Sequence, residues 1–282
     1  MKKILVLVAC MLLLVGCSDA TAKITNGSET VVTVGDQSYT REELYNFMTN
    51  YGGSYYAIVN AQKTILDTEV PVTDEMISSV DSTLELYSQM MGSYFETYLQ
   101  SQGFAGSEQY REVLIQNEQL NELYKKYVEA NYDSLSSTFA PKKIQLMKFG
   151  TEEEANTALQ AVKDGNDFAT VAQENKSTVD GAAQLVTSTS SFETVVQYAI
   201  NTQAVGELSE VIGNDDKTAY YVLKVLSTDA AELKEEAIPV IATAETIADQ
   251  SIQYYFKEYN FTVYDINLYN QLQQSYSDLL NQ

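Results

Sequence analysis

The segment from Lys142 to Glu154 reads KKIQLMKFGTEEE and decides how the chain folds, because a strand and a helix meet within it. Up to Phe149 the side chains alternate with a period of two, which predicts a β-strand. Its two faces are expected to carry Ile144, Leu146 and Lys148, and Gln145, Met147 and Phe149. Thr151–Glu154 then forms a capping box, which predicts a helix from Glu152 onward. A strand followed at once by a helix favours a mixed α+β domain.

The same pattern continues over residues 140–228. Asp164–Gly165 is expected to stop the first helix, and Asp167 to begin a short second one. Gly181–Ser191 is small and polar, which predicts a loop. The remaining expected elements are a helix over Phe192–Ile200, a strand over Leu208–Ile212, a turn at Asn214–Lys217 and a strand over Ala219–Leu226. Residues 140–228 are therefore predicted to form one small α+β domain.

The residues before this domain, 30–139, read mainly as helices. A short hairpin over Thr30–Tyr39 is expected first, and Thr40–Glu43 is a second capping box that begins a helix. A helix that starts after Pro71 is expected to continue through Tyr98 and to end at Gly103, and Ser107 begins a third. Ser134–Pro141 is rich in serine and is expected to be a linker.

The residues after the domain, 229–282, also read as largely helical. A helical region is expected over Leu233–Tyr259. Pro239 should cause a break or a new start near its beginning, because proline cannot donate a backbone hydrogen bond. Phe261–Tyr264 is expected to be a strand and Asn267–Leu280 the final helix.

The first residues predict export. Lys2 and Lys3 precede the apolar run Ile4–Val15, which is shorter than the about 20 residues that a membrane-spanning helix needs. A charged start and a short apolar run are typical of a signal peptide. Leu14–Cys17 (LVGC) is the cleavage pattern of bacterial lipoproteins, in which the cysteine thiolate accepts the lipid. The alternative is an ordinary secretory signal with a chance cysteine.

We therefore expect residues 1–16 to be a signal peptide, Cys17 to carry lipid, and residues 17–29 to form a polar tether. The protein would be anchored at the extracytoplasmic face of the cell membrane, because two acyl chains hold a protein stably on a bilayer.

The composition excludes several kinds of chemistry. The chain has no histidine, and its only cysteine besides Cys17 is Cys10, inside the signal peptide. Ser-His-Asp and Cys-His catalysis and the usual zinc sites are thus excluded, and we expect no metal and no cofactor. Removing Lys2 and Lys3 leaves 15 basic against 39 acidic side chains, a net charge of −24 over 266 residues. Such a surface repels nucleic acid, so we expect no nucleic-acid partner.

Four stretches in the middle segment resemble the parvulin family of peptidyl-prolyl isomerases. They follow one another in the family's order and spacing over about 85 residues: KIQLM at 143–147, EEA…GNDF at 153–168, VGELS at 205–209 and AYYVLKV at 219–225. The resemblance implies an isomerase fold with two inward-facing histidines below the pocket for proline.

This chain departs from that pattern, because Gln145 and Tyr221 stand where the family has its two histidines. Asp180 is the nearby candidate for the family's acidic residue, Phe192 for the floor of the pocket, and the glycine-rich loop has become Ala182–Val186, with Gln184 at its centre. We expect these to be vestigial positions, with no catalytic residue. Gln145 and Tyr221 are expected to hydrogen-bond to each other across the sheet.

The flanks resemble the PrsA- and SurA-type foldases. The Val31–Leu44 stretch is similar to their N-terminal start, and Gln102–Leu114 to one of their helices. The resemblance implies an α+β protein in which the N- and C-terminal parts form one helical chaperone domain and the parvulin-like domain is inserted between them. It also implies a function: a membrane-anchored foldase that binds unfolded or partly folded secreted polypeptides, with homodimers allowed.

Two alternatives stay open, an active peptidyl-prolyl isomerase and a surface binding or adhesion lipoprotein without chaperone activity. Among the tyrosines, the Tyr51–Tyr56 cluster is the expected exposed surface, whereas Tyr87, Tyr98 and Tyr124 are expected to fill helix–helix cores.

Overall fold

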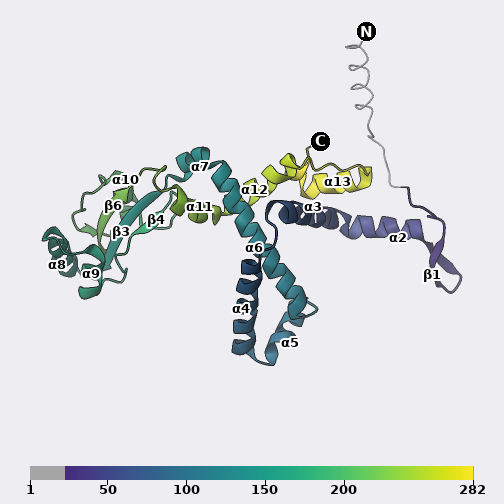
Figure 1. Cartoon of the computed structure of the whole chain (residues 1–282), viewed down its shortest axis with the longest axis horizontal. Coiled ribbons are helices and arrows are strands. Elements are labelled where there is room, and N and C mark those ends of the chain that lie inside the picture. The colour runs from purple at the N-terminus through teal and green to yellow at the C-terminus, as the bar shows by residue number, and fades with distance from the viewer. Residues whose placement is uncertain (1–22, 282) are drawn as a thin grey trace, which may run out of the picture. The chain divides into compact units, whose positions relative to one another are not determined.

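The computed structural model describes residues 23–281 and confirms the α+β class (Figure 1). The chain divides into two compact units. The first comprises the chain up to Leu120 together with the chain from Asp249 onward, and the second is Asn121–Ala248. The N- and C-terminal parts therefore share one unit. The predicted boundaries at residues 140 and 228 lie inside the second unit, since the divisions fall within two long helices.

The first unit is helical apart from one hairpin. Its elements are β1 (Thr30–Val34), β2 (Gln37–Thr40), α2 (Arg41–Met48), the π-helical turn η1 (Thr49–Gly53), α3 (Ser54–Glu69), α4 (Asp74–Met91), α5 (Tyr94–Ser101), most of α6 (Ser107–Ala130), most of α12 (Glu245–Glu258), α13 (Ile266–Ser275) and the 3₁₀ turn η2 (Ser277–Leu279). The Thr40–Glu43 capping box is present, as predicted. Buried side chains such as Leu66, Leu99 and Phe256 form its interior.

The second unit is built on a four-stranded antiparallel sheet in the order β4-β3-β6-β5. Its elements are α7 (Tyr132–Phe139), β3 (Lys142–Phe149), α8 (Glu152–Lys163), α9 (Phe168–Glu174), β4 (Gln184–Val186), α10 (Thr194–Thr202), β5 (Ile212–Gly213), β6 (Tyr220–Ser227) and α11 (Lys234–Ala242). The Thr151–Glu154 capping box and the Asp167 cap are confirmed.

Both faces of this sheet are covered. On one face Ile144 and Leu146 pack with Val196 and Ile200 of α10, and on the other Met147 packs with residues of α8 and α9. Figure 1 shows α10 on one side of β3 and β6, and α8 and α9 on the other. Because both faces of the sheet are buried, the side chains of β3 near its end are apolar whichever face they point to.

The expected linker Ser134–Pro141 is wrong, because α7 occupies most of it. Tyr132, Leu135 and Phe139 lie on one side of this helix and are buried against Ala237 and Ile241 of α11. This burial of apolar surface outweighs the weak helix preference of the serines between them.

Helix boundaries in the flanks also differ from the prediction. Gly92, with φ of 53°, ends α4, so the expected continuation through Tyr98 is a separate helix, α5. Pro239 lies inside α11, and the break between α11 and α12 falls at Thr243–Ala244 instead. The buried Ala237 and Ile241 on either side of Pro239 hold the helix together despite the missing donor.

Three smaller elements were also mispredicted. The segment Phe261–Tyr264 is not a strand; the Phe261 ring packs against Phe256, with ring centres 5.1 Å apart. The expected strand at Leu208–Ile212 is reduced to β5, because the Ser209 hydroxyl accepts a hydrogen bond from the Leu223 amide at 2.8 Å in place of a continuous ladder. The expected loop Gly181–Ser191 contains β4, which pairs with β3.

Candidate functional site

Two regions could carry function: the parvulin-like face of the second unit and the exposed apolar surface of the first. On the parvulin-like face, Tyr221 of β6 pairs with Lys148 of β3. Residues that pair directly across antiparallel strands point to the same face of the sheet. Tyr221 therefore lies on the α10 face, together with Ile144 and Leu146.

Tyr221 is the centre of a small polar cluster. Its hydroxyl donates a hydrogen bond to Glu193 Oε1, just before α10, and Lys148 Nζ lies 3.5 Å from the same oxygen. Lys148 Nζ also lies 5.4 Å from the centre of the Tyr221 ring, within the range of a cation–π contact.

The contacts among Tyr221, Glu193 and Lys148 shift the pKa of each group, and the three shifts agree with one another. Burial, and then the bond to Glu193, raises the pKa of Tyr221. The hydrogen bond from Tyr221 lowers the pKa of Glu193, and the interaction with Tyr221 raises that of Lys148. The tyrosine therefore stays neutral, the glutamate negative and the lysine positive through neutral pH. None of them is suited to general acid–base catalysis, which needs a pKa near the working pH.

Gln145 lies on the opposite face of the sheet. It pairs with Lys224, one position out of phase with Tyr221, and its amide Nε2 donates to the carbonyl of Gly181 at 3.0 Å. The expected hydrogen bond between Gln145 and Tyr221 is therefore wrong, because the period of two in each strand sends the two side chains to different sides.

The other predicted positions are divided between the two faces and the loop. Gln184 pairs with Ile144 and so shares the α10 face, and Phe192 packs against that core. Asp180 is exposed in the loop before β4, where its Oδ1 accepts a hydrogen bond from the amide of Ala182 at 3.0 Å. The structure thus brings Tyr221, Gln184 and Phe192 to one face and leaves Gln145 and Asp180 away from it.

The face around Tyr221 is closed. The Tyr221 side chain is only 3% exposed and is surrounded by buried aliphatic residues of β3, β6 and α10. A substrate proline would have to displace this packing to reach the position of the family's second histidine.

The exposed surface of the first unit is different in character. The helices α2 and α3 are continuous through η1, and an aromatic stripe runs along them. The aromatic stripe consists of Leu44, Phe47, Met48, Tyr51, Tyr55 and Tyr56. Tyr51, Tyr55 and Tyr56 are 80%, 62% and 67% exposed, which confirms the expected exposure of the Tyr51–Tyr56 cluster.

The other side of η1 is covered by α13. A Cβ atom on Gly53 would lie 3.4 Å from Leu268 Cδ1, and Gln271 Nε2 donates to Asn50 Oδ1 at 3.2 Å. One side of this segment is thus packed while the aromatic stripe is left on the outside. π-Helical turns occur often at functional sites.

A second exposed set lies on α4 and α5 and comprises Leu86, Tyr87, Met90, Tyr94 and Tyr98. Tyr87 and Tyr98 were expected to be core residues, but they are 39% and 40% exposed. Helical spacing alone does not distinguish an outward stripe from a buried one.

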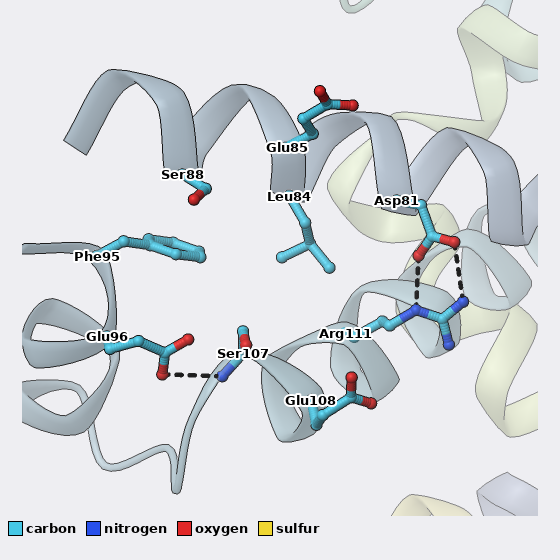
Figure 2. Close-up of a pocket in the computed structure, with 9 residues that line it drawn as sticks. All are labelled: Asp81, Leu84, Glu85, Ser88, Phe95, Glu96, Ser107, Glu108 and Arg111. Carbon is cyan, nitrogen blue, oxygen red and sulfur yellow. Dashed lines mark hydrogen bonds and ion pairs between the residues drawn. The ribbon is translucent and has the colours of Figure 1, made fainter. Parts of the chain in front are cut away.

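A cavity of about 430 Å³ lies between α4, α5 and the start of α6 (Figure 2). Leu84 and Phe95 point into it and form an apolar floor, as Figure 2 shows. The remaining lining residues are polar: four carboxylates (Asp81, Glu85, Glu96 and Glu108), Ser88, Ser107 and Arg111. Arg111 closes one end with two hydrogen bonds to Asp81, at 2.6 and 3.2 Å, and these bonds lower the pKa of Asp81.

Sequence reasoning missed Glu193, Lys148 as its neighbour, and the Asp81–Arg111 pair. Each contact joins residues 28 to 45 positions apart. The sequence offered one signal for these contacts: the alternation of side chains in the strand placed Lys148 on the same face as Ile144 and Leu146.

Some predictions fall outside what the structure describes. Cys17, the expected site of lipid attachment, precedes the described residues. No helix within residues 23–281 has the length and apolar character that crossing a membrane requires. In the same range, no three acidic or cysteine side chains gather as ligands for a metal ion.

Comparison with known proteins gives a consistent picture. No family model matches the chain. The foldase protein PrsA of Streptococcus gordonii is 25% identical over 305 residues, covering 98% of this chain and 97% of that protein. Among solved structures, foldase protein PrsA from Streptococcus pneumoniae has a TM-score of 0.48 at 19% identity, covering 87% of this chain and 98% of that one. The peptidylprolyl isomerase PrsA from Bacillus cereus has a TM-score of 0.46 at 20% identity, with 89% and 99% covered. The sequence relationship to the Streptococcus gordonii foldase runs through nearly all of both chains, so this chain resembles the PrsA-type foldases along its length.

Proposed function

We propose that this protein is an extracytoplasmic foldase that holds unfolded or partly folded secreted polypeptides and is anchored to the membrane by lipid on Cys17. Client chains would contact the aromatic stripe of the helical unit. The parvulin-like unit would add binding surface but little isomerase activity. The proposal rests on the relationship to a foldase and, above all, on one observation: the exposed aromatic stripe on α2 and α3.

The chemistry of the aromatic stripe suits loosely structured clients. Tyrosine and methionine offer apolar contact area with adaptable geometry, and the tyrosine hydroxyl can still bond to water or to a peptide group. Exposed apolar surface on a folded unit marks an interaction site when it is continuous. The cavity beside α4, with its apolar floor and carboxylate rim, offers a second contact for segments that carry an aliphatic and a basic side chain.

The closed face around Tyr221 supports the expectation of weak isomerase activity. Isomerisation must lower a barrier of about 18–20 kcal/mol at the bond before proline. Here the position of one histidine is a buried tyrosine bonded to Glu193, and Gln145 points to the other side of the sheet.

Suppression of aggregation tests the proposal. The full-length protein should slow the aggregation of a reduced, unfolding client, and Tyr51→Gln/Tyr55→Gln/Tyr56→Gln should lose most of this effect. Glutamine keeps the helix preference and the solvent exposure while removing the ring. Tyr198→Gln/Tyr264→Gln, at two equally exposed tyrosines outside the aromatic stripe, is the matched control and should behave like the parent.

The outcomes separate the alternatives. A parent that never delays aggregation, but that binds a folded surface ligand, would favour the adhesion lipoprotein. A proline-peptide isomerisation rate close to that of histidine-containing parvulins would favour the active isomerase and contradict the weak-activity part of the proposal.

A further inference from the structure

The hairpin at the start of the first unit presents an apolar face to solvent. Register places Val32 opposite Tyr39 and Val34 opposite Gln37, so Val32, Val34 and Tyr39 share one face. We call these three residues the hairpin patch. Every residue of β1 is exposed, and Val34 is 67% exposed. Exposed apolar side chains that gather on one face mark an interaction site, so a partner for the patch is expected.

The hairpin is held firmly against the start of α2. The Glu42 amide donates to the Gly27 carbonyl at 3.0 Å and the Arg41 amide to the Glu29 carbonyl at 2.9 Å. The Arg41 guanidinium also forms an ion pair with Glu29 at 2.6 Å. The segment from Gly27 to Glu29, which the sequence suggested was tether, is thus part of the folded unit.

This leaves little chain between the fold and the proposed lipid. The Ile24 carbonyl accepts a hydrogen bond from the Gly27 amide at 3.1 Å, and only six residues, Ser18–Lys23, separate Ile24 from Cys17. Seven residue steps span at most about 25 Å even when fully extended. Because the acyl chains on Cys17 would lie in the bilayer, Ile24 would remain within that distance of the headgroups, and β1 of the hairpin begins six residues after it.

From this geometry we infer that the hairpin patch docks on the membrane surface and contacts the headgroup–acyl boundary. The inference rests on the proposed lipid anchor at Cys17. A short tether keeps the local concentration of membrane high, so modest apolar contacts are enough for docking. Tyrosine is enriched at this boundary because its ring is apolar and its hydroxyl polar.

The charges around the patch select the type of lipid. The patch itself is uncharged, whereas Asp36 lies in the hairpin turn and Glu42 and Glu43 follow in α2. These carboxylates are repelled by anionic headgroups, and salt screens the repulsion. Docking should therefore be stronger on zwitterionic than on anionic membranes, and rising salt should reduce the difference.

A tryptophan reporter tests docking directly, since the chain contains no tryptophan. Val34→Trp places the only indole in the patch, and Tyr264→Trp places it at an equally exposed position elsewhere in the first unit as a matched control. Both full-length, lipidated proteins are reconstituted into phosphatidylcholine vesicles that contain lipid spin-labelled at the headgroup. Emission of the Val34→Trp protein should shift to the blue and be quenched at least about twofold, whereas emission of the Tyr264→Trp protein should be nearly unaffected.

Two further variants sharpen the test. Val32→Ser/Tyr39→Ser in the Val34→Trp background should abolish the quenching. Inserting about 20 Gly/Ser residues after Cys17 lengthens the tether from seven to about 27 steps. The reach of a flexible linker grows as the square root of its length, so the local concentration of the patch at the plane of the bilayer should fall about twofold. Docking, and with it the quenching, should weaken accordingly.

Several results would overturn the inference. Vesicle-bound Val34→Trp protein with solvent-like emission would show that the patch does not touch the membrane, whereas loss of protein from the vesicles would contradict the lipid anchor itself. If the indole is shielded from solvent only at high protein density on the vesicle, the patch binds a second copy of the chain. If it is shielded only when an unfolded client is added, the patch binds clients. Chaperone activity is read separately, on the Tyr51, Tyr55 and Tyr56 variant.

Discussion

Gly181, in the loop before β4, lies against α9, and replacing it with alanine should be costly. Its backbone has φ of 72°, a conformation that L residues other than glycine rarely adopt. A Cβ atom there would lie 2.7 Å from Ala172 Cβ and 3.1 Å from both Ala169 Cα and the Phe168 carbonyl oxygen. These atoms belong to the first turns of α9 or to its buried side, so they cannot swing aside as a flexible side chain would.

The magnitude follows from three contributions. An alanine with positive φ costs about 1 kcal/mol, and overpacking against α9 costs about 2 kcal/mol. Displacing the Gly181 carbonyl weakens its 3.0 Å bond from Gln145, which is worth about 1 kcal/mol. Gly181→Ala should therefore destabilise the second unit by about 4 kcal/mol. Gly165→Ala is the matched control: its φ is 97°, but a Cβ atom would meet nothing within 4 Å, so the cost should be only about 1 kcal/mol.

Hydrogen exchange of the full-length protein, read by mass spectrometry on peptides from β3 and α9, measures this difference locally. A loss of about 4 kcal/mol corresponds to roughly thousandfold faster exchange of the protected amides, against about tenfold or less for Gly165→Ala. Peptides from α4 and α5, in the other unit, should be unchanged. Equal protection in the two glycine variants would refute the reasoning, because it would mean that α9 moves away without cost.

The anchor, the site and a buried tyrosine each give one further prediction. Cys17→Ala should leave the protein unprocessed or released, and labelling cells with a radioactive fatty acid should show no label on the variant; persisting label would contradict the anchor. Gln145→His/Tyr221→His should not restore isomerase activity in a proline-peptide assay, since the two imidazoles would lie on opposite faces of the sheet. The double variant should also unfold at a lower urea concentration, because Glu193 loses its hydroxyl donor. A gain in the isomerisation rate would show that the argument from strand register is wrong. Burial, and then Glu69, raises the pKa of Tyr255 to about 12, above its unfolded value of about 10. The stability that the neutral hydroxyl contributes is therefore complete below pH 10 and is lost as the pH rises through 12. Tyr255→Phe should flatten this alkaline loss of stability in urea titrations followed by the helical signal, and an unchanged slope would argue against it.

Local features were readable from the sequence because they depend on residues a few positions apart. The caps at Thr40, Thr151 and Asp167 each need only a side chain and an amide three residues later, and all three are present. The alternation in β3 likewise predicted the strand. The relationship to parvulins and foldases was visible because its motifs are contiguous in the chain.

Tertiary structure decided what local pattern leaves open. Tyr51 and Leu99 both follow helical spacing, yet one is 80% exposed and the other buried, because exposure depends on which helix faces are covered. The Ser134–Pro141 segment became helix only because α11 covers its apolar side.

The candidate site shows the same division most clearly. Sequence similarity identified Gln145 and Tyr221 as the positions of interest, but their separation onto two faces follows from the register between β3 and β6. A shift of one residue in that register would reverse the face of every side chain, and no local signal fixes it. The sequence by itself determined which residues could form the site. Only the folded sheet determined that Tyr221 meets Glu193 and Lys148, because those contacts join strands and a helix that are distant along the chain.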